Sequence, residues 1–340
     1  MNQARKTIHD VADLARVSIK TVSRVLNDEP GVRPDTRDRV RDAMASLNYQ
    51  PSLHARGLAG RRSGLIALVI ENPSANYFFD VQSGAMAKCR EMRFRLLVQS
   101  CDDLGGDLVP EVMAMIEQTH VDGAVITPPL SANHDLISAL DARGVPFVRI
   151  APDGLAHASP IVEIDDEAAA REMAAFLLAA GHRSIGFIAG HPDHHSSTLR
   201  RNGFFAELAA RGLDGGAVPV EQGFNTFASG LDAGRRLLGR AVRPTAIFAS
   251  NDDMAAGVLF AAQEAGVAVP GQLSVSGFDD TQLASAVYPP LTTVHQPSYD
   301  MAFTATALLI DAIRGRDVPS STSLRHTLVE RGSTAPFSAG

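Results

Sequence analysis

The first residues whose types suggest chemistry lie in a short segment near the N-terminus. At helical spacing this segment projects a set of polar side chains from one face, with two further residues near its start: Lys20, Ser23, Arg24 and Asn27, with Ile19 and Thr21. Arginine can hold guanine through two hydrogen bonds, and lysine, serine, threonine and asparagine bond phosphates or bases. The segment therefore predicts contact with nucleic acid.

A second group of polar and aromatic residues follows the predicted strands of the remaining chain. In parallel sheets, ligands bind beyond the carboxyl ends of the strands. The residues at those places, which we expect to contact a ligand, are Tyr77, Phe78, Thr127, Arg149, Ser197, Arg200, Phe224, Asn225, Asn251, Asp252, Asp279 and Gln296. Such a set offers the paired hydrogen bonds and the aromatic ring face that sugar binding needs. Two alternatives stay open, because Asp252 and Asp279 can cap helices and Tyr77 and Phe78 can belong to the core.

Other clusters suggest metal binding or catalysis less strongly. The run from His191 to His195 contains three histidines and an aspartate, but no second ligand group follows at a known spacing. The acid pairs at 252–253 and 279–280 have no nucleophile at a recognisable spacing. The chain has no Gly-x-Gly-x-x-Gly after a strand and no Walker-type motif. We therefore expect no enzyme activity, no cofactor and no metal.

The nucleic-acid segment belongs to a predicted pair of short helices. Thr7 can cap the first helix, with Asp10 three residues later, and Ser18 can cap the second. Val17 and Val22 stand at the positions of a hydrophobic staple around that second cap. Two helices joined by three residues, with a polar outer face on the second, are typical of a helix-turn-helix. A third helix beginning at a proline packs against them, through Val40, Ala43, Met44 and Leu47.

The rest of the chain alternates short apolar runs with helical segments, which predicts α/β architecture. The first series of predicted strands is 65–70, 95–100, 123–127 and 146–150, with helices at about 77–92, 106–119 and 133–143. The second series has strands at 161–164, 185–189, 218–221, 246–250 and 273–277, with helices at about 166–180, 197–211, 227–239 and 253–265. We expect two doubly wound lobes, with the chain crossing back near 290–296 and returning a helix at about 297–314 to the first.

Composition and charge support this division of the chain. Residues 1–62 hold 12 Lys/Arg and 7 Asp/Glu, a net of +5, whereas the remainder carries 19 and 31, a net of −12. A basic head on an acidic body favours a polyanion as the partner of the head. The longest apolar run, 173–180, is far shorter than the ~20 residues that span a bilayer, and the N-terminus lacks an apolar signal core. We therefore expect a cytoplasmic protein, with Cys89 and Cys101 as buried thiols.

Three ordered motifs of the head resemble one protein family. Thr-x-x-Asp-Val-Ala at 7–12, Val-Ser-x-x-Thr-Val-Ser-Arg-Val-Leu-Asn at 17–27 and Leu-Asn-Tyr-x-Pro-x-x-x-Ala-Arg at 47–56 are similar to the lactose-repressor/galactose-repressor family. The resemblance implies that Ile19, Lys20 and Arg24 read bases in the major groove. It implies phosphate contacts from Thr7, Ser18, Thr21, Ser23 and Asn27.

The linker after the head has a role that the resemblance supplies. Residues 51–60 begin with a proline and end with a glycine, which suits a helix too short to be stable alone. The resemblance implies a hinge helix whose Leu58 wedges into the minor groove, with Ala55 at the contact of paired hinges. Further DNA contacts are expected from Tyr49, Ser52 and Arg56. A flexible linker is the alternative.

The resemblance extends to the body, with departures. It implies a periplasmic-binding-protein-like sensor with an effector in the cleft between its lobes, and the closest matches to its lining are Arg200, Asn251, Asp279 and Gln296. Three positions differ from the family pattern: Arg16 replaces a glycine in the helix-helix turn, Ala151 replaces a frequent aspartate, and Asn225 occupies a position that is commonly aromatic or polar. A positive φ at Arg16 costs roughly 1 kcal/mol.

These observations predict an effector-controlled transcription regulator, most often a repressor. We expect a helix-turn-helix head at 1–50, a hinge at 51–62 and a sensor at 63–340, with lobe 1 at about 63–160 and 292–322 and lobe 2 at about 161–291 and 323–335. A homodimer would place two heads on a near-palindromic operator of double-stranded DNA, and a small effector, a sugar, would change the angle between the lobes. The alternatives are a regulator that responds to a purine or a phosphoprotein co-repressor, and a plain ligand-binding protein.

Overall fold

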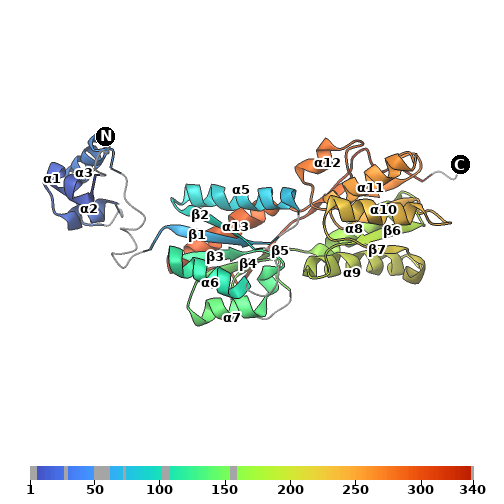
Figure 1. Ribbon diagram of the computed structural model, residues 1–340, viewed down its shortest axis with the longest axis horizontal. Coiled ribbons are helices and arrows are strands. Elements are labelled where there is room, and N and C mark those ends of the chain that lie inside the picture. The colour runs from blue at the N-terminus through green and yellow to red at the C-terminus, as the bar shows by residue number, and fades with distance from the viewer. Residues whose placement is uncertain are drawn as a thin grey trace. The chain divides into compact units, whose positions relative to one another are not determined.

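The chain divides into two compact units, Met1–Ser63 and Gly64–Gly340. The computed structural model describes residues 6–26, 30–49, 62–71, 74–101, 108–153 and 159–337, and Figure 1 labels their helices and strands. Within these described residues, no helix is long and apolar enough to cross a bilayer.

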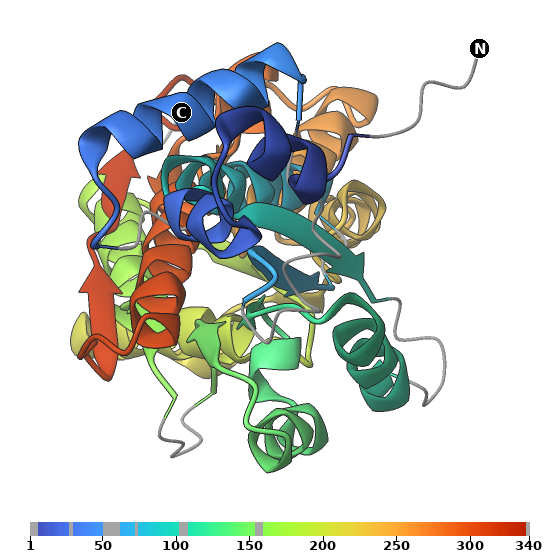
Figure 2. The ribbon, with the colours of Figure 1, turned by 90° about the vertical axis from the view of Figure 1, so that its left-hand side faces the viewer.

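The first unit contains three described helices, α1 (Ile8–Ala15), α2 (Ile19–Leu26) and α3 (Pro34–Ser46). Thr7 and Asp10 form the predicted capping box of α1, and Pro34 opens α3. All three helices contribute to one small core, which consists of Val11, Ala12, Ala15, Val22, Val25, Val40 and Ala43. The predicted pair of short helices and the third helix that packs on them are thereby confirmed (Figure 2).

The first lobe of the second unit is built on a parallel sheet of six strands. Its order is β11-β5-β4-β3-β1-β2, and every neighbouring pair is parallel. The strands are β1 (Leu65–Ile70), β2 (Arg95–Ser100), β3 (Gly123–Ile126), β4 (Phe147–Ile150), β5 (Ile161–Ile164) and β11 (Ser321–Leu324). The helices of the lobe are α5 (Ala75–Glu91), α6 (Leu108–Thr119), α7 (His134–Ala142) and α13 (Ser298–Ile313), with a 3₁₀ turn at Leu130–Ala132.

Strand β1 shows why this sheet is covered on both faces. Alternate side chains of a strand point to opposite faces. Ile66, Leu68 and Ile70 therefore join the core that α5 and α13 complete, whereas Ala67 and Val69 join the core of α6 and α7. Buried on both faces, the strand reads as a continuous apolar run. Cys89 and Cys101 are buried thiols, as predicted.

The second lobe is built on a parallel sheet of four strands in the order β7-β6-β8-β9. The strands are β6 (Ile185–Ala189), β7 (Val220–Gln222), β8 (Ala246–Ala249) and β9 (Ser274–Ser276). One helix pair, α8 (Asp166–Ala179) with α9 (His195–Ala210), packs on the face of Phe187; the other, α10 (Phe227–Leu238) with α11 (Asp252–Glu264), packs on the face of Ile188. Two short elements complete the lobe, the 3₁₀ turn Gly215–Ala217 and α12 (Gln282–Ala286).

One strand does not lie where the sequence predicts. The segment Ile161–Ile164 was expected to begin the second lobe, but as β5 it pairs with β4 in the sheet of the first lobe. Strand membership depends on which backbone groups a strand bonds, and β5 bonds β4 on one side and β11 on the other. The chain therefore enters the second lobe only after Ile164, at the start of α8.

The return crossing also adds elements that the sequence analysis did not predict. Strand β10 (Thr293–His295) pairs antiparallel with β12 (Thr327–Val329). Strand β11 lies at the edge of the first sheet, and because its sequence is polar, no apolar run predicted it. The predicted return helix is confirmed as α13, which packs on α5 and on β3, β4 and β5.

Candidate functional sites

Helix α2 separates a buried face from an exposed one. Val22 and Val25 pack into the core of the head, whereas Ile19, Lys20 and Arg24 are exposed on the other side. Ser18 fixes the start of the helix, because its Oγ accepts a hydrogen bond from the Thr21 backbone N–H at 3.1 Å. The predicted base-reading side chains thus project from a helix whose other side is anchored.

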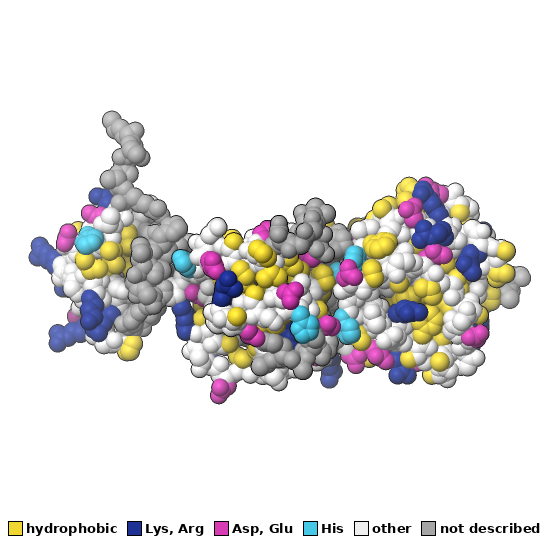
Figure 3. All heavy atoms as spheres, turned by 60° about the horizontal axis from the view of Figure 1, so that its bottom comes forward, with side chains coloured by type: hydrophobic (Ala, Val, Ile, Leu, Met, Phe, Trp, Pro, Cys, Tyr) yellow, Lys and Arg dark blue, Asp and Glu magenta, His cyan; other side chains and the backbone are white. Residues whose placement is uncertain are grey.

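The other predicted DNA contacts differ in exposure. Thr7 and Ser18 are exposed and Thr21 and Ser23 are half-buried, whereas Tyr49 is half-buried against the core of the head. Lys and Arg side chains are frequent on the face of this unit drawn in Figure 3. The remaining predicted contacts, Asn27, Ser52, Ala55, Arg56 and Leu58, lie outside the described residues.

Arg16 adopts the left-handed conformation that the family's glycine would adopt easily. Its φ of 55° and ψ of 49° place it at the C-terminus of α1, and the Val17 backbone N–H donates to the Ala12 carbonyl at 3.0 Å. This hydrogen bond helps close the end of the helix in the way a glycine-containing cap does. The turn therefore keeps its geometry without glycine, at a cost of roughly 1 kcal/mol.

A narrow polar cleft of about 450 Å³ lies between the two lobes of the second unit. The first lobe contributes Ser74, Tyr77, Pro128 and Ala151, the second contributes Asp166, His194, Ser196, Arg200, Asn225, Asn251 and Asp279, and Gln296 stands on the returning chain. A ligand in this cleft would contact both lobes at once.

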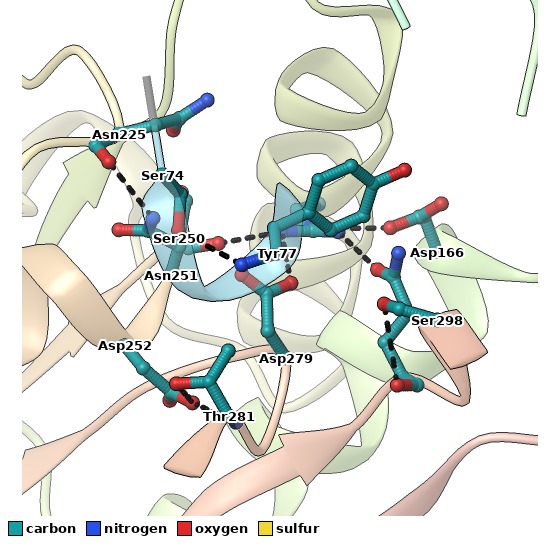
Figure 4. A network of polar contacts seen from close by, with 12 residues as sticks. Ser74, Tyr77, Asp166, Asn225, Ser250, Asn251, Asp252, Asp279, Thr281 and Ser298 are labelled. Carbon is teal, nitrogen blue, oxygen red and sulfur yellow. Dashed lines mark hydrogen bonds and ion pairs between the residues drawn. The ribbon is translucent and has the colours of Figure 1, made fainter. Parts of the chain in front are cut away.

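Arg200 is the centre of the cleft's hydrogen-bond network, and its partners Asp166, Ser250 and Asp279 are labelled in Figure 4. Its Nε donates to Asp166 Oδ1 at 2.7 Å and its Nη2 to Gln296 Oε1 at 2.6 Å. Its Nη1 donates to the Ser250 carbonyl at 2.7 Å and lies 3.5 Å from Asp279 Oδ1. The guanidinium carbon also lies 3.6 Å from the centre of the Phe278 ring. One cation therefore orients acceptors that come from four different segments.

The charges of this network are buried and strongly coupled. Burial raises the pKa of Asp279 well above its ordinary value, and it also raises the pKa of Asp166, although the Arg200 cation opposes both effects. Burial lowers the pKa of Arg200, but the two carboxylates outweigh it and the net pKa is raised. A buried charge of this kind must be paired, and here one arginine serves two acids.

The predicted ligand contacts divide into two sets. Six of them line the cleft: Tyr77, Arg200, Asn225, Asn251, Asp279 and Gln296. Tyr77 also packs into the core of the first lobe, so it is both a core residue and a lining residue of the cleft. The other six are not among the lining residues: Phe78, Thr127, Arg149, Ser197, Phe224 and Asp252.

The six residues off the cleft mostly have structural contacts. Phe78 packs against the core of the first lobe, and Thr127 Oγ1 donates to the Val69 carbonyl at 3.3 Å. Arg149 is buried and its Nε donates to Ser159 Oγ at 2.9 Å, while Ser197 is buried in the first turn of α9. Phe224, by contrast, is exposed.

The open question of helix caps is answered by Asn251. Its Oδ1 accepts a hydrogen bond from the Met254 backbone N–H at 3.0 Å, so Asn251 and not Asp252 caps α11. Asn251 Nδ2 also donates to the Asn225 carbonyl at 3.1 Å, which ties the cap to the cleft. Neither Asp252 nor Asp279 is the N-cap residue of a described helix.

Six lining residues were not among the predicted contacts: Ser74, Pro128, Ala151, Asp166, His194 and Ser196. Asp166 follows β5, so the strand-end rule applied to that strand would have found it. Ser74 caps α5 and also donates from its hydroxyl to Asp253 of α11, and Asn76 Nδ2 donates to the same carboxylate at 3.1 Å. These contacts join the two lobes beside the cleft. Because the partners are far apart in the sequence, no local sequence pattern predicts them.

His194 belongs to the histidine run that suggested a metal. In the described part of the chain, no three His, Cys, Asp or Glu side chains come together as metal ligands. Burial lowers the pKa of His194 to about 4, so its ring is neutral near pH 7. It presents an uncharged imidazole to the cleft.

Asp252 gives a prediction about pH. Burial raises its pKa from 3.8 to about 7, against the lowering effect of the hydrogen bonds from Thr293 and Thr281. The folded state then binds a proton that the unfolded state has released, so this group's stabilisation is complete below about pH 4 and is lost as the pH rises through about 7. The unfolding free energy of the wild type should fall by roughly 1–2 kcal/mol more than that of Asp252→Asn between about pH 5 and pH 8.

Urea unfolding at several pH values would measure this difference. The exposed Asp317 supplies the control, since Asp317→Asn should follow the wild type at every pH. Parallel pH profiles for the wild type and Asp252→Asn would contradict the prediction.

Comparison with known proteins gives the family. A model of bacterial regulatory proteins of the lacI family matches residues 7–52, and a periplasmic binding protein-like domain matches residues 174–334. Catabolite control protein A of Priestia megaterium is 33% identical over 334 residues, which cover 96% of this chain and 99% of that protein.

Solved structures agree over nearly the whole chain. The lac repressor dimer bound to operator and the anti-inducer ONPF superimposes with a TM-score of 0.85 at 28% identity, covering 98% of this chain and all of that one. The complex of the transcriptional regulator CelR with cellobiose has a TM-score of 0.74 at 31% identity, covering 97% and 100%. A helix-turn-helix head with an exposed polar face, a two-lobed body and one-third identity to a full-length relative show that this chain belongs to the lacI family and is a DNA-binding transcription regulator.

Proposed function

We propose that the protein represses transcription by binding a near-palindromic operator as a homodimer, and that a sugar in the interlobe cleft controls this binding. The observation that carries the effector proposal is the Arg200 network, which arranges acidic, amide and guanidinium groups beside the Tyr77 ring. These groups are the donors and acceptors that hydroxyl groups require. The relatives support the proposal, since one structure contains cellobiose and another contains operator DNA.

The charge of the cleft favours a neutral ligand. Asp166 and Asp279 already share Arg200, the one Lys or Arg side chain among the lining residues, so an added phosphate or carboxylate would compete with them for that cation. Taking the cation from a buried acid is costly. A neutral polyol avoids that competition and still uses the acids as hydrogen-bond partners.

Control of DNA binding would follow from the position of the cleft. A ligand held by Tyr77 of the first lobe and Arg200 of the second has different contacts when the lobes change their angle. An effector shifts a conformational equilibrium only through such differential contacts.

The proposal is tested by selecting DNA from a random pool and measuring its affinity. We expect the full-length protein to select a near-palindrome, and fluorescence anisotropy to show a changed affinity when an effector sugar is added. Selection of no symmetric sequence at moderate salt would overturn the proposed function.

An apolar groove on the second lobe supports a homodimer. It has a volume of about 500 Å³ and is lined by residues of α10, α11 and the segment after α12, among them Phe227, Leu259, Phe260 and Tyr288. Phe227, Phe260 and Tyr288 are all exposed. Large exposed apolar patches on soluble proteins mark sites of association, and a two-fold contact uses the same patch on both copies.

Substitution of Phe260 would test this face. Phe260→Glu should weaken the dimer on the order of a hundredfold, because a charge would be buried in an apolar contact. Operator affinity should fall with it, since two linked heads bind far better than one. Sedimentation equilibrium measures the first effect and anisotropy the second. Val242→Glu, at another exposed apolar residue, is the control and should leave both unchanged; an unaltered dimer in Phe260→Glu would exclude this face.

A further inference from the structure

A row of three aromatic side chains leads out of the cleft along the second lobe. His194 lines the cleft and is buried, and its ring centre lies 5.2 Å from that of His191. The His191 ring centre in turn lies 5.7 Å from that of Phe224, which meets it at an interplanar angle of 74°. His191 is half-buried and Phe224 is 47% exposed, so exposure increases along the row. Histidine side chains are also visible where the two lobes meet in Figure 3.

The two loops that carry this row are fastened to each other. The His191 backbone N–H donates to Asn225 Oδ1 at 3.2 Å, and Gln222 Nε2 donates to the Gly190 carbonyl at 2.6 Å. The Asp193 backbone N–H donates to His191 Nδ1 at 3.2 Å, which holds the imidazole in place. The Phe224 backbone N–H donates to Ser229 Oγ at 2.9 Å. A surface fixed in this way loses little conformational entropy when a ligand binds.

Phe224 has no role in the interior that would explain it. It is absent from the hydrophobic clusters of the described residues, and its ring contact is with His191 rather than with a core residue. An apolar ring exposed directly beside a polar cleft is typical of a ligand-binding surface. Asn225, its neighbour in sequence, lines the cleft, so a ligand seated against Arg200 can extend over Phe224 without leaving the protein.

We propose that His191 and Phe224 form an outer subsite for a second sugar ring, so that the effector is a disaccharide or a longer oligosaccharide. This inference rests on the proposed function of the cleft. The inner ring would occupy the narrow polar part around Arg200, where hydrogen bonds orient it. The next ring would lay its apolar C–H face on Phe224, while its hydroxyl groups stay in water. The outer subsite adds apolar contact but few hydrogen bonds. It therefore selects ligands by their length more than by their stereochemistry.

Calorimetric titration with a defined set of sugars tests this subsite. The probes are glucose and galactose, with the disaccharides maltose, cellobiose, lactose and melibiose. We expect at least one disaccharide to bind about tenfold or more tightly than either monosaccharide, because it buries the Phe224 ring. Phe224→Ala should remove that advantage and leave monosaccharide binding unchanged, whereas Phe224→Trp should keep it.

A matched control and a second measurement separate the possible failures. Phe337 is an equally exposed phenylalanine of the second lobe, and Phe337→Ala should not alter the ratio of affinities. The inference is overturned if a monosaccharide binds as tightly as every disaccharide, if Phe224→Ala keeps the ratio, or if no sugar in the set binds. Operator affinity of the same preparations is measured in parallel, because its loss would count against the proposed function and not against the subsite alone.

Discussion

Replacing Lys20 and Arg24 by alanine together is expected to abolish sequence-specific operator binding while the head stays folded. Both side chains are exposed on α2, and the stability of the head depends on the opposite face, through Val22 and Val25. An arginine held in two hydrogen bonds to a base contributes about 1–3 kcal/mol of discrimination, so Arg24→Ala alone should lower specific affinity roughly 5- to 150-fold. Anisotropy with the selected operator and with a scrambled duplex measures that ratio.

The control for this prediction lies on α3. Arg39 is exposed there, and Arg39→Ala removes the same charge from the head without altering α2. If Arg24 reads a base, its loss lowers the ratio of specific to non-specific binding, whereas loss of a phosphate contact weakens both alike and reduces the salt dependence. Equal effects of Arg24→Ala and Arg39→Ala would mean that α2 does not read the sequence.

The head could be predicted well because its signals are local. The cap of α1 depends on Thr7 and Asp10, three residues apart, and the hydrogen bonds at both residues are present as expected. Arg16 shows the limit of this kind of inference, because its residue type gave the cost of a positive φ but not whether the turn adopts one. The structure keeps the turn and accepts a positive φ.

The cleft could be predicted only in part, because its contacts are distant in sequence. Arg200 meets Asp166, Asp279 and Gln296 from separate segments, and the strand-end rule brought three of these four residues together. Asp166, the fourth, also follows a predicted strand, at 161–164, but was not among the predicted contacts. The rule gives the edge at which a residue lies but not the direction of its side chain, so Thr127 and Arg149 were expected in the cleft and are instead bonded within the first lobe.

Arg200→Met is expected to have the largest effect of any single change in the cleft, on both stability and effector response. It leaves the buried Asp166 and Asp279 without their cation, and removing one partner of a buried ion pair costs roughly 3–5 kcal/mol. Urea unfolding would measure that loss. Arg200→Lys keeps the charge but not the planar fork, so it should fold better and still lose the sugar's effect on operator affinity.

A second substitution tests whether the unfolding free energy lost in Arg200→Met is lost because buried carboxylates are left without a cation. Asp166→Asn added to Arg200→Met removes one of the two buried carboxylates, so it should recover part of the lost unfolding free energy. Arg235→Met is the matched control, because Arg235 bonds Glu264 at an exposed site where an ion pair contributes little to stability. If Arg200→Met were no more destabilising than Arg235→Met, the buried network would not be an ionised one. If sugar still changed the operator affinity of Arg200→Lys, the planar guanidinium group of Arg200 would not be what holds the ligand.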